Sequence, residues 1–168
     1  MTKWVALFSN SGKELAELIE KSGKKPDFIV CDKIRTEHDS RLNNVAIEDH
    51  EDIISWLSQL DEDVLVTLHG YWRIIPASKI ECKIYNVHPG DIFKYPELIG
   101  IHPQKKAIEL NLPSTGVLIH EVDDTVDGGE PVLFSDYNIE EGTTVDELTD
   151  QLRYEAVKLW EMFLVGRV

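Results

Sequence analysis

Apolar and polar positions follow two different periods in the first part of the chain, and together they predict alternating strands and helices. Residues 3–9 and 28–31 are short, mostly apolar runs, which favour buried strands. Residues 13–21 instead carry apolar side chains at helical spacing, with glutamates between them. A strand–helix–strand opening requires a parallel sheet with a right-handed crossover connection.

The same two patterns predict the elements that follow. Further strands are expected at 45–47, 64–68, 84–88, 114–121 and 132–137. Helices are expected at 50–60, shortly after Pro76, at 103–110 and at 144–165. Residues 35–44 are polar and irregular, and no repeat or linker divides the chain. We therefore expect residues 1–168 to form a single α/β domain, whose mostly parallel twisted sheet is flanked by helices.

Composition and charge limit the classes of partner. The 168 residues are 42% hydrophobic and 29% charged, which excludes a disordered chain. Seventeen Lys and Arg against 31 Asp and Glu give a net charge of −14, which repels nucleic acid and anionic membranes. We expect neither as a partner.

Two cysteines, Cys31 and Cys82, are too few for a disulfide framework or a zinc site, and they suit a reducing compartment. Nothing approaches the roughly 18 apolar residues of a membrane span, and the apolar stretch near the N-terminus is too short for a signal peptide. These features predict a cytoplasmic protein.

Three polar clusters fall at expected strand ends, where open α/β sheets bind their ligands. In the first, Tyr85-Asn86-Val87-His88-Pro89-Gly90, strand alternation puts Asn86 and His88 on one face. An amide donor beside an imidazole suits a developing oxyanion, although a hydrogen-bonded pair that merely closes a strand has the same pattern.

The second cluster lies at 120–131, where Asp123, Asp124 and Asp127 precede a pair of glycines. It is either a ligand-binding loop or a solvated acidic loop, and it lacks the spacing of an EF-hand. The third cluster, residues 9–12, precedes a predicted helix whose N-terminal N–H groups can hold an anion. Because it has no Gly-rich phosphate pattern, a plain strand-to-helix turn is favoured there.

Taken in order, these clusters resemble the 10-formyltetrahydrofolate-dependent formyltransferases, and glycinamide ribonucleotide transformylases in particular. The matching segments are Gly70-Tyr71-Trp72-Arg73-Ile74-Ile75, Asn86-Val87-His88-Pro89, Lys94-Tyr95-Pro96, His120 and Asp124-Thr125-Val126-Asp127-Gly128-Gly129. Each segment is weak alone, but their order and spacing are specific. The resemblance implies a Rossmann-like formyltransferase domain, an enzyme that transfers a formyl group from 10-formyltetrahydrofolate to a primary amine, and no metal.

The resemblance also implies roles for individual residues. Asn86 and protonated His88 would stabilise the oxyanion, while Asp127 would favour the imidazolium and take the proton of the amine. The folate would be bound by Arg73, Ile74, Ile75, Val122, Asp123 and Asp124. The acceptor would be bound by Asn10, Ser11, Gly12, Lys13 and His102.

Departures from the family pattern lie on the acceptor side. Asn10, Lys13 and Glu14 differ from the family's phosphate loop, and Glu14 would repel a phosphate unless Lys13 offsets its charge. Glycinamide ribonucleotide, and with it purine biosynthesis, is the first expectation. An amino sugar nucleotide, an amino-acid-type amine or water (a hydrolase) are the alternatives. We expect neither the N-terminal domain of such hydrolases nor the C-terminal segments of the sugar enzymes, and a homodimer is left open.

Overall fold

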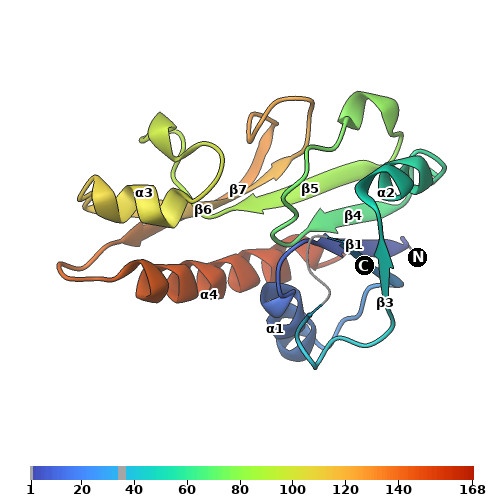
Figure 1. Cartoon of the computed structure of the whole chain (residues 1–168), viewed down its shortest axis with the longest axis horizontal. Coiled ribbons are helices and arrows are strands. Elements are labelled where there is room, and N and C mark those ends of the chain that lie inside the picture. Colours follow the sequence, from blue (N-terminus) through green and yellow to red (C-terminus); the bar gives the residue numbers. More distant parts are fainter. Residues whose placement is uncertain (1, 34–36) are drawn as a thin grey trace.

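In the computed structural model, which describes residues 2–33 and 37–168, seven strands form one sheet in the order β3-β2-β1-β4-β5-β6-β7 (Figure 1). The strands are β1 (Trp4–Phe8), β2 (Phe28–Asp32), β3 (Val45–Glu48), β4 (Leu65–Leu68), β5 (Lys83–His88), β6 (Ser114–Glu121) and β7 (Pro131–Asn138). Neighbours from β3 to β5 pair in parallel, and β5, β6 and β7 pair antiparallel. The expected mostly parallel α/β sheet is confirmed.

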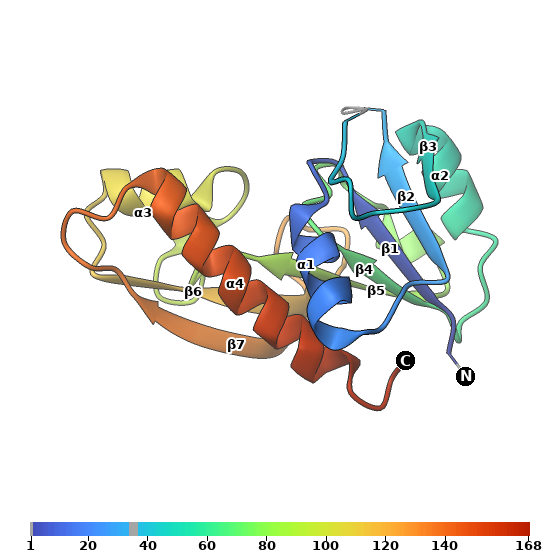
Figure 2. The same ribbon diagram turned by 90° about the horizontal axis from the view of Figure 1, so that it is seen from below.

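Helices cover both faces of the sheet, as its two buried faces require. They are α1 (Lys13–Ser22), α2 (His50–Leu57), α3 (Pro103–Glu109) and α4 (Val145–Leu164). Figure 2 shows α1 and α4 side by side across one face, with α2 behind the other. Alternate residues of β1 accordingly join different cores: Ala6 and Phe8 pack with α1 and α4, whereas Val5 and Leu7 pack with α2.

Several boundaries differ from the sequence prediction. The helix expected to reach residue 60 ends at Leu57, because its last turn tightens and the N–H of Leu60 donates to the carbonyl of Leu57 at 3.2 Å. The helix expected after Pro76 is a single 3₁₀ turn, Ala77–Lys79, and a second one, Pro96–Leu98, was not foreseen. Of the irregular stretch 35–44, residues 35 and 36 lie outside the described residues.

Both cysteines are buried, and burial raises the pKa of the Cys31 thiol to about 11, so it is a poor nucleophile. Among the described residues, no helix is long and apolar enough to cross a membrane. Over the same residues, no group of three or more His, Cys, Asp or Glu is arranged to hold a metal ion.

A capping box starts α4. The Thr144 hydroxyl accepts the N–H of Glu147 at 3.2 Å, and the Glu147 carboxylate accepts the N–H of Thr144 at 2.9 Å. We expect Thr144→Ala to lower the free energy of unfolding by about 1 kcal/mol, because one N–H of the first turn loses its acceptor. Urea denaturation would measure this, and an unchanged midpoint would contradict the role of the cap.

Candidate active site

A cavity of about 580 Å³ opens where the carboxyl ends of β1, β4 and β5 meet. Its lining comes from residues 10–14 after β1, 68–75 after β4, 86–89 at the end of β5, 100–105, most of 122–127, and α4. This volume is typical of a small-molecule site, and the edge of the sheet is the one expected from the parallel strands.

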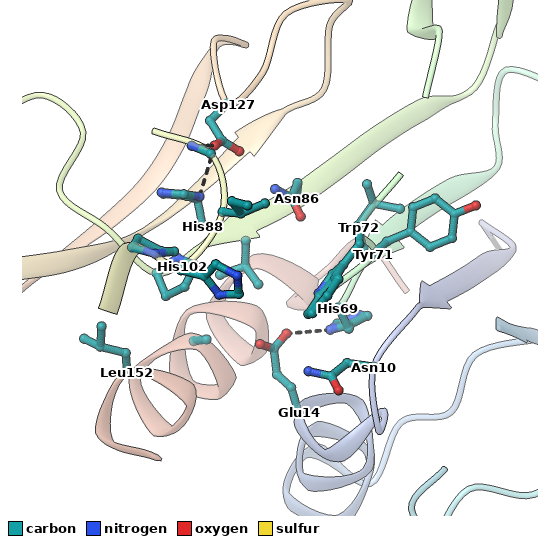
Figure 3. Close-up of a pocket in the computed structure, with 18 of the residues that line it drawn as sticks. Asn10, Glu14, His69, Tyr71, Trp72, Asn86, His88, His102, Asp127 and Leu152 are labelled. Carbon is teal, nitrogen blue, oxygen red and sulfur yellow. Dashed lines mark hydrogen bonds and ion pairs between the residues drawn. The ribbon is translucent and has the colours of Figure 1, made fainter. Parts of the chain in front are cut away.

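His88 is buried at the end of β5, and oxygen atoms face both of its ring nitrogens. Nε2 lies 2.8 Å from the carbonyl oxygen of Leu98, to which it donates. Nδ1 lies 3.2 Å from Oδ2 of Asp127 (Figure 3). With Asp127 ionised, the arrangement that satisfies both contacts is the doubly protonated imidazolium. Gly90 leaves room for this ring, since a Cβ there would lie 2.9 Å from Nε2.

Asp127 is held as a carboxylate by its surroundings. Burial acts to raise the pKa of this group, but contact with His88 and the N–H of Gly100, which donates to Oδ2 at 2.8 Å, outweighs burial. The pKa of Asp127 therefore lies below its ordinary value, and the side chain is ionised at neutral pH. Its backbone is left-handed, with φ of 52°, a conformation that Asp tolerates better than most residues.

His120 orients Asn86. The two residues face each other across the β5–β6 ladder, and Nδ2 of Asn86 lies 3.3 Å from Nε2 of His120. Burial lowers the pKa of His120, so the ring is neutral at pH 7, and its 3.7 Å approach to Asp127 is not an ion pair. Nδ1 of His120 donates to the carbonyl of Glu121 at 3.1 Å, which leaves Nε2 as the acceptor for Asn86. One N–H of Asn86 is fixed in this way, and the other remains available on the cavity side.

The loop that carries Asp127 is closed tightly at its base. The N–H of Glu121 donates to the carbonyl of Glu130 at 2.8 Å, and Gly129 packs directly against the Glu121 carbonyl. Only a residue without a side chain fits at Gly129.

We expect Gly129→Ala to lower the free energy of unfolding by about 1–3 kcal/mol, because the added methyl overlaps the backbone oxygen of Glu121. Gly128→Ala is the matched control, since its methyl would meet the side chain of Thr125, which can rotate away. Thermal or urea unfolding of both variants would measure the difference. An equal loss of unfolding free energy in the two variants would show that the loop does not depend on the close approach of Gly129 to the Glu121 carbonyl.

Nearly all of the residues expected at the site line the cavity. They are Asn10, Ser11, Gly12, Lys13, Arg73, Ile74, Ile75, Asn86, His88, His102, Val122, Asp123 and Asp127. Asp124 does not: its carboxylate accepts the N–H of Ser78 at 3.1 Å, so this side chain is turned away from the cavity. The two neighbouring isoleucines of the site differ in exposure: Ile75 is 2% exposed, whereas Ile74 is 66% exposed.

Sequence reasoning gave no role to several residues that hold this site. His120 was part of the motif pattern, but only the antiparallel register places it opposite Asn86. The N–H of Gly100 and the carbonyl of Leu98 carry no signal in the sequence at all. The Glu14 carboxylate pairs with buried His69 at 2.8 Å, which links two cavity residues 55 positions apart.

Comparison with known proteins shows a family match and several relatives of this chain. A family model described as formyl transferase matches residues 2–162. The methionyl-tRNA formyltransferase of Rickettsia typhi is 30% identical over 127 residues, which cover 73% of this chain and 40% of that protein. The phosphoribosylglycinamide formyltransferase of Escherichia coli is 28% identical over 103 residues, or 60% of this chain and 47% of that protein. The chain thus spans less than half the length of these relatives.

Solved structures agree on the fold. The phosphoribosylglycinamide formyltransferase of Bacillus halodurans is 26% identical, with a TM-score of 0.79 over 99% of this chain and 97% of that one. An N-formyltransferase of Helicobacter canadensis, in complex with folinic acid and dTDP-3-aminofucose, is 19% identical, with a TM-score of 0.76 over 99% of this chain and 64% of that one. The Rossmann-like fold expected from the sequence is confirmed.

Proposed function

Since the chain belongs to the formyl transferase family, we propose that it transfers the formyl group of 10-formyltetrahydrofolate to a primary amine. The observation that carries the proposal is the arrangement of three side chains in one cavity. Asn86 is oriented by neutral His120, His88 is held between Leu98 and Asp127, and Asp127 is ionised. A free amide donor, a cation and a base are the groups that formyl transfer needs.

Each group has a part in the reaction. The amine nitrogen attacks the formyl carbon, and the carbonyl oxygen gains negative charge. The available N–H of Asn86 donates to that oxygen. His88 contributes its positive charge and its Nδ1–H, which it shares between Asp127 and the developing oxygen.

Asp127 then acts as the proton acceptor. Its carboxylate takes a proton from the attacking amine, directly or through one water. The bond between the formyl carbon and the folate nitrogen then breaks, and that nitrogen receives the proton from the carboxyl group of Asp127. No covalent enzyme intermediate is required, and Cys31 and Cys82 lie outside the cavity lining. The transfer is complete when the new amide and tetrahydrofolate leave.

Residues 73–75 and 122–127 form the part of the cavity that we assign to the folate donor. Ile74 and Val126 expose apolar surface there, and buried Ile75 backs the wall, which suits a flat heterocycle. Since the carboxylate of Asp124 is bound to Ser78, that residue contributes at most its backbone. The folinic acid named for the Helicobacter canadensis structure is a formylated folate, which supports a donor of this class.

The names of the relatives point to different acceptors: methionyl-tRNA, phosphoribosylglycinamide and an amino sugar nucleotide. What these acceptors share is a primary amine, so the proposal is stated at that level. Phosphoribosylglycinamide, the acceptor expected first from the sequence, is the first to test. The absence of a nucleic-acid partner, a cytoplasmic location and a homodimer remain predictions.

The test is to incubate the protein with 10-formyltetrahydrofolate and follow the release of tetrahydrofolate with and without a panel of amines. Release that requires an amine supports the proposal. Release without any amine, abolished by Asn86→Ala, would identify a hydrolase instead. A protein that releases nothing with any primary amine contradicts the proposed transfer.

A further inference from the structure

The carboxylate of Glu14 lies in the cavity on the side away from Asp127. Figure 3 shows Asn86 and His88 between Asp127 and the pair formed by Glu14 and His69. Glu14 belongs to the first turn of α1, and its side chain is only 18% exposed. With the donor assigned to residues 73–75 and 122–127, the Glu14 end is left for the acceptor.

Two partly buried hydrogen bonds hold one oxygen of this carboxylate. Oε1 accepts from Nδ1 of His69 at 2.8 Å and from Nε1 of Trp160 at 3.0 Å. Within the described chain no hydrogen bond or ion pair reaches Oε2, and no buried side-chain atom there lacks a partner, so Oε2 is open to the cavity. The fixed oxygen sets the direction of the side chain, and the open one can accept from a ligand.

The direction of the hydrogen bonds leaves Glu14 with its full negative charge. Nε1 of Trp4 donates to the hydroxyl of Thr67 at 2.8 Å, and that hydroxyl lies 2.8 Å from Nε2 of His69 but 3.5 Å from the carbonyl of Val5. The shorter contact makes the hydroxyl a donor to Nε2. His69 therefore needs only one ring proton, on Nδ1, to satisfy Glu14, and a neutral ring leaves the carboxylate charge uncompensated.

Most of the cations around the cavity are already paired. In the described part of the chain, four Lys and Arg residues line it: Lys13, Arg73, Lys105 and Arg153. Arg153 lies 3.1 Å from Glu17 and 2.8 Å from Asp150, Lys105 lies 3.6 Å from Glu109, and Arg73 lies 3.9 Å from Asp32. Lys13 acts only at longer range on the carboxylates of Asp39 and Asp150, and it forms no ion pair within the described residues. A phosphate bound beside Glu14 would face the negative charge of that carboxylate.

From the open oxygen of Glu14 we infer the class of acceptor: a primary amine that carries a second ammonium group, which Oε2 of Glu14 binds. The inference rests on the proposed function and adds its substrate class. An ammonium is matched to an open carboxylate oxygen in a partly buried site, because a charge-assisted hydrogen bond is strong where water is limited. Of the acceptors expected from the sequence, it favours an amino-acid-type amine over a ribonucleotide.

The experiment compares matched acceptors in the transfer assay: α,ω-diamines of increasing length, the amino alcohols in which a hydroxyl replaces one ammonium, and phosphoribosylglycinamide. Wild-type protein should use the best diamine with a kcat/KM about 10- to 100-fold above that of its amino alcohol. Glu14→Gln should remove this preference and leave the KM for 10-formyltetrahydrofolate unchanged. Glu20→Gln, the same change on the exposed surface of α1, should retain it.

Calorimetry of the diamine with the folate-bound protein gives a readout independent of turnover, and Glu14→Gln should weaken that binding by a similar factor. A preference for phosphoribosylglycinamide, or equal use of diamine and amino alcohol, overturns the inference while the proposed transfer stands. If no amine is formylated, the proposed function fails, and diamine binding that Glu14→Gln leaves unchanged then overturns the inference separately. Because glutamine still accepts from Trp160 through its own oxygen, the variant should fold, as a thermal melt would verify.

Discussion

Replacing Asn86 with alanine is expected to lower kcat by about 100- to 1000-fold while the affinity for the folate donor stays nearly unchanged. The side chain lies at the end of β5, with one amide N–H held by Nε2 of His120 at 3.3 Å. The other N–H is the neutral donor available to the oxygen that becomes negative. Such a contact strengthens as charge develops, so its loss affects the transition state more than the ground state.

Steady-state kinetics at saturating amine, together with equilibrium binding of the donor, would separate these two effects. Asn43→Ala, at an exposed asparagine outside the cavity, is the matched control and should behave as wild type. A rate within a few-fold of wild type for Asn86→Ala would show that the oxyanion is stabilised by other groups. A large loss of donor affinity would instead make Asn86 a binding residue.

Local pattern predicted elements whether or not they are fully buried, since β3 and β7 were both expected and are exposed or half-buried along their length. The uninterrupted apolar run of β1 is buried along its whole length, and the amphipathic pattern of α4 begins at the Thr144 cap. Strand direction leaves no such mark, because β6 is buried through its middle as a parallel strand would be, yet it pairs antiparallel with both neighbours. The extent of α2 was also overestimated, since its last turn tightens although the apolar spacing continues to Leu60.

The candidate site, like the fold, was predictable from the sequence only in part. Strand alternation placed Asn86 and His88 together, and the resemblance supplied Asp127. By contrast, adjacent Ile74 and Ile75 are chemically identical and differ only in which way the loop turns them. Contacts such as that of Glu14 with His69 depend on tertiary pairing of β1 and β4, which no local period specifies.

Replacing Asp127 with asparagine is expected to lower kcat by about 100- to 10,000-fold, because the variant loses the proton acceptor and the negative partner of His88. The wild-type pH profile follows from the lowered pKa of Asp127. A carboxyl with a lowered pKa stays ionised above the ordinary Asp range of about 4, so it causes no loss of rate from about pH 5 upward. The rate should fall on the acid side only below that range.

Asparagine cannot ionise, so the variant should lack the acid limb that belongs to Asp127. Asp136→Asn, at an exposed position of β7, is the matched control and should keep both the rate and the profile. An acid limb that persists in Asp127→Asn would show that Asp127 is not the group that causes it.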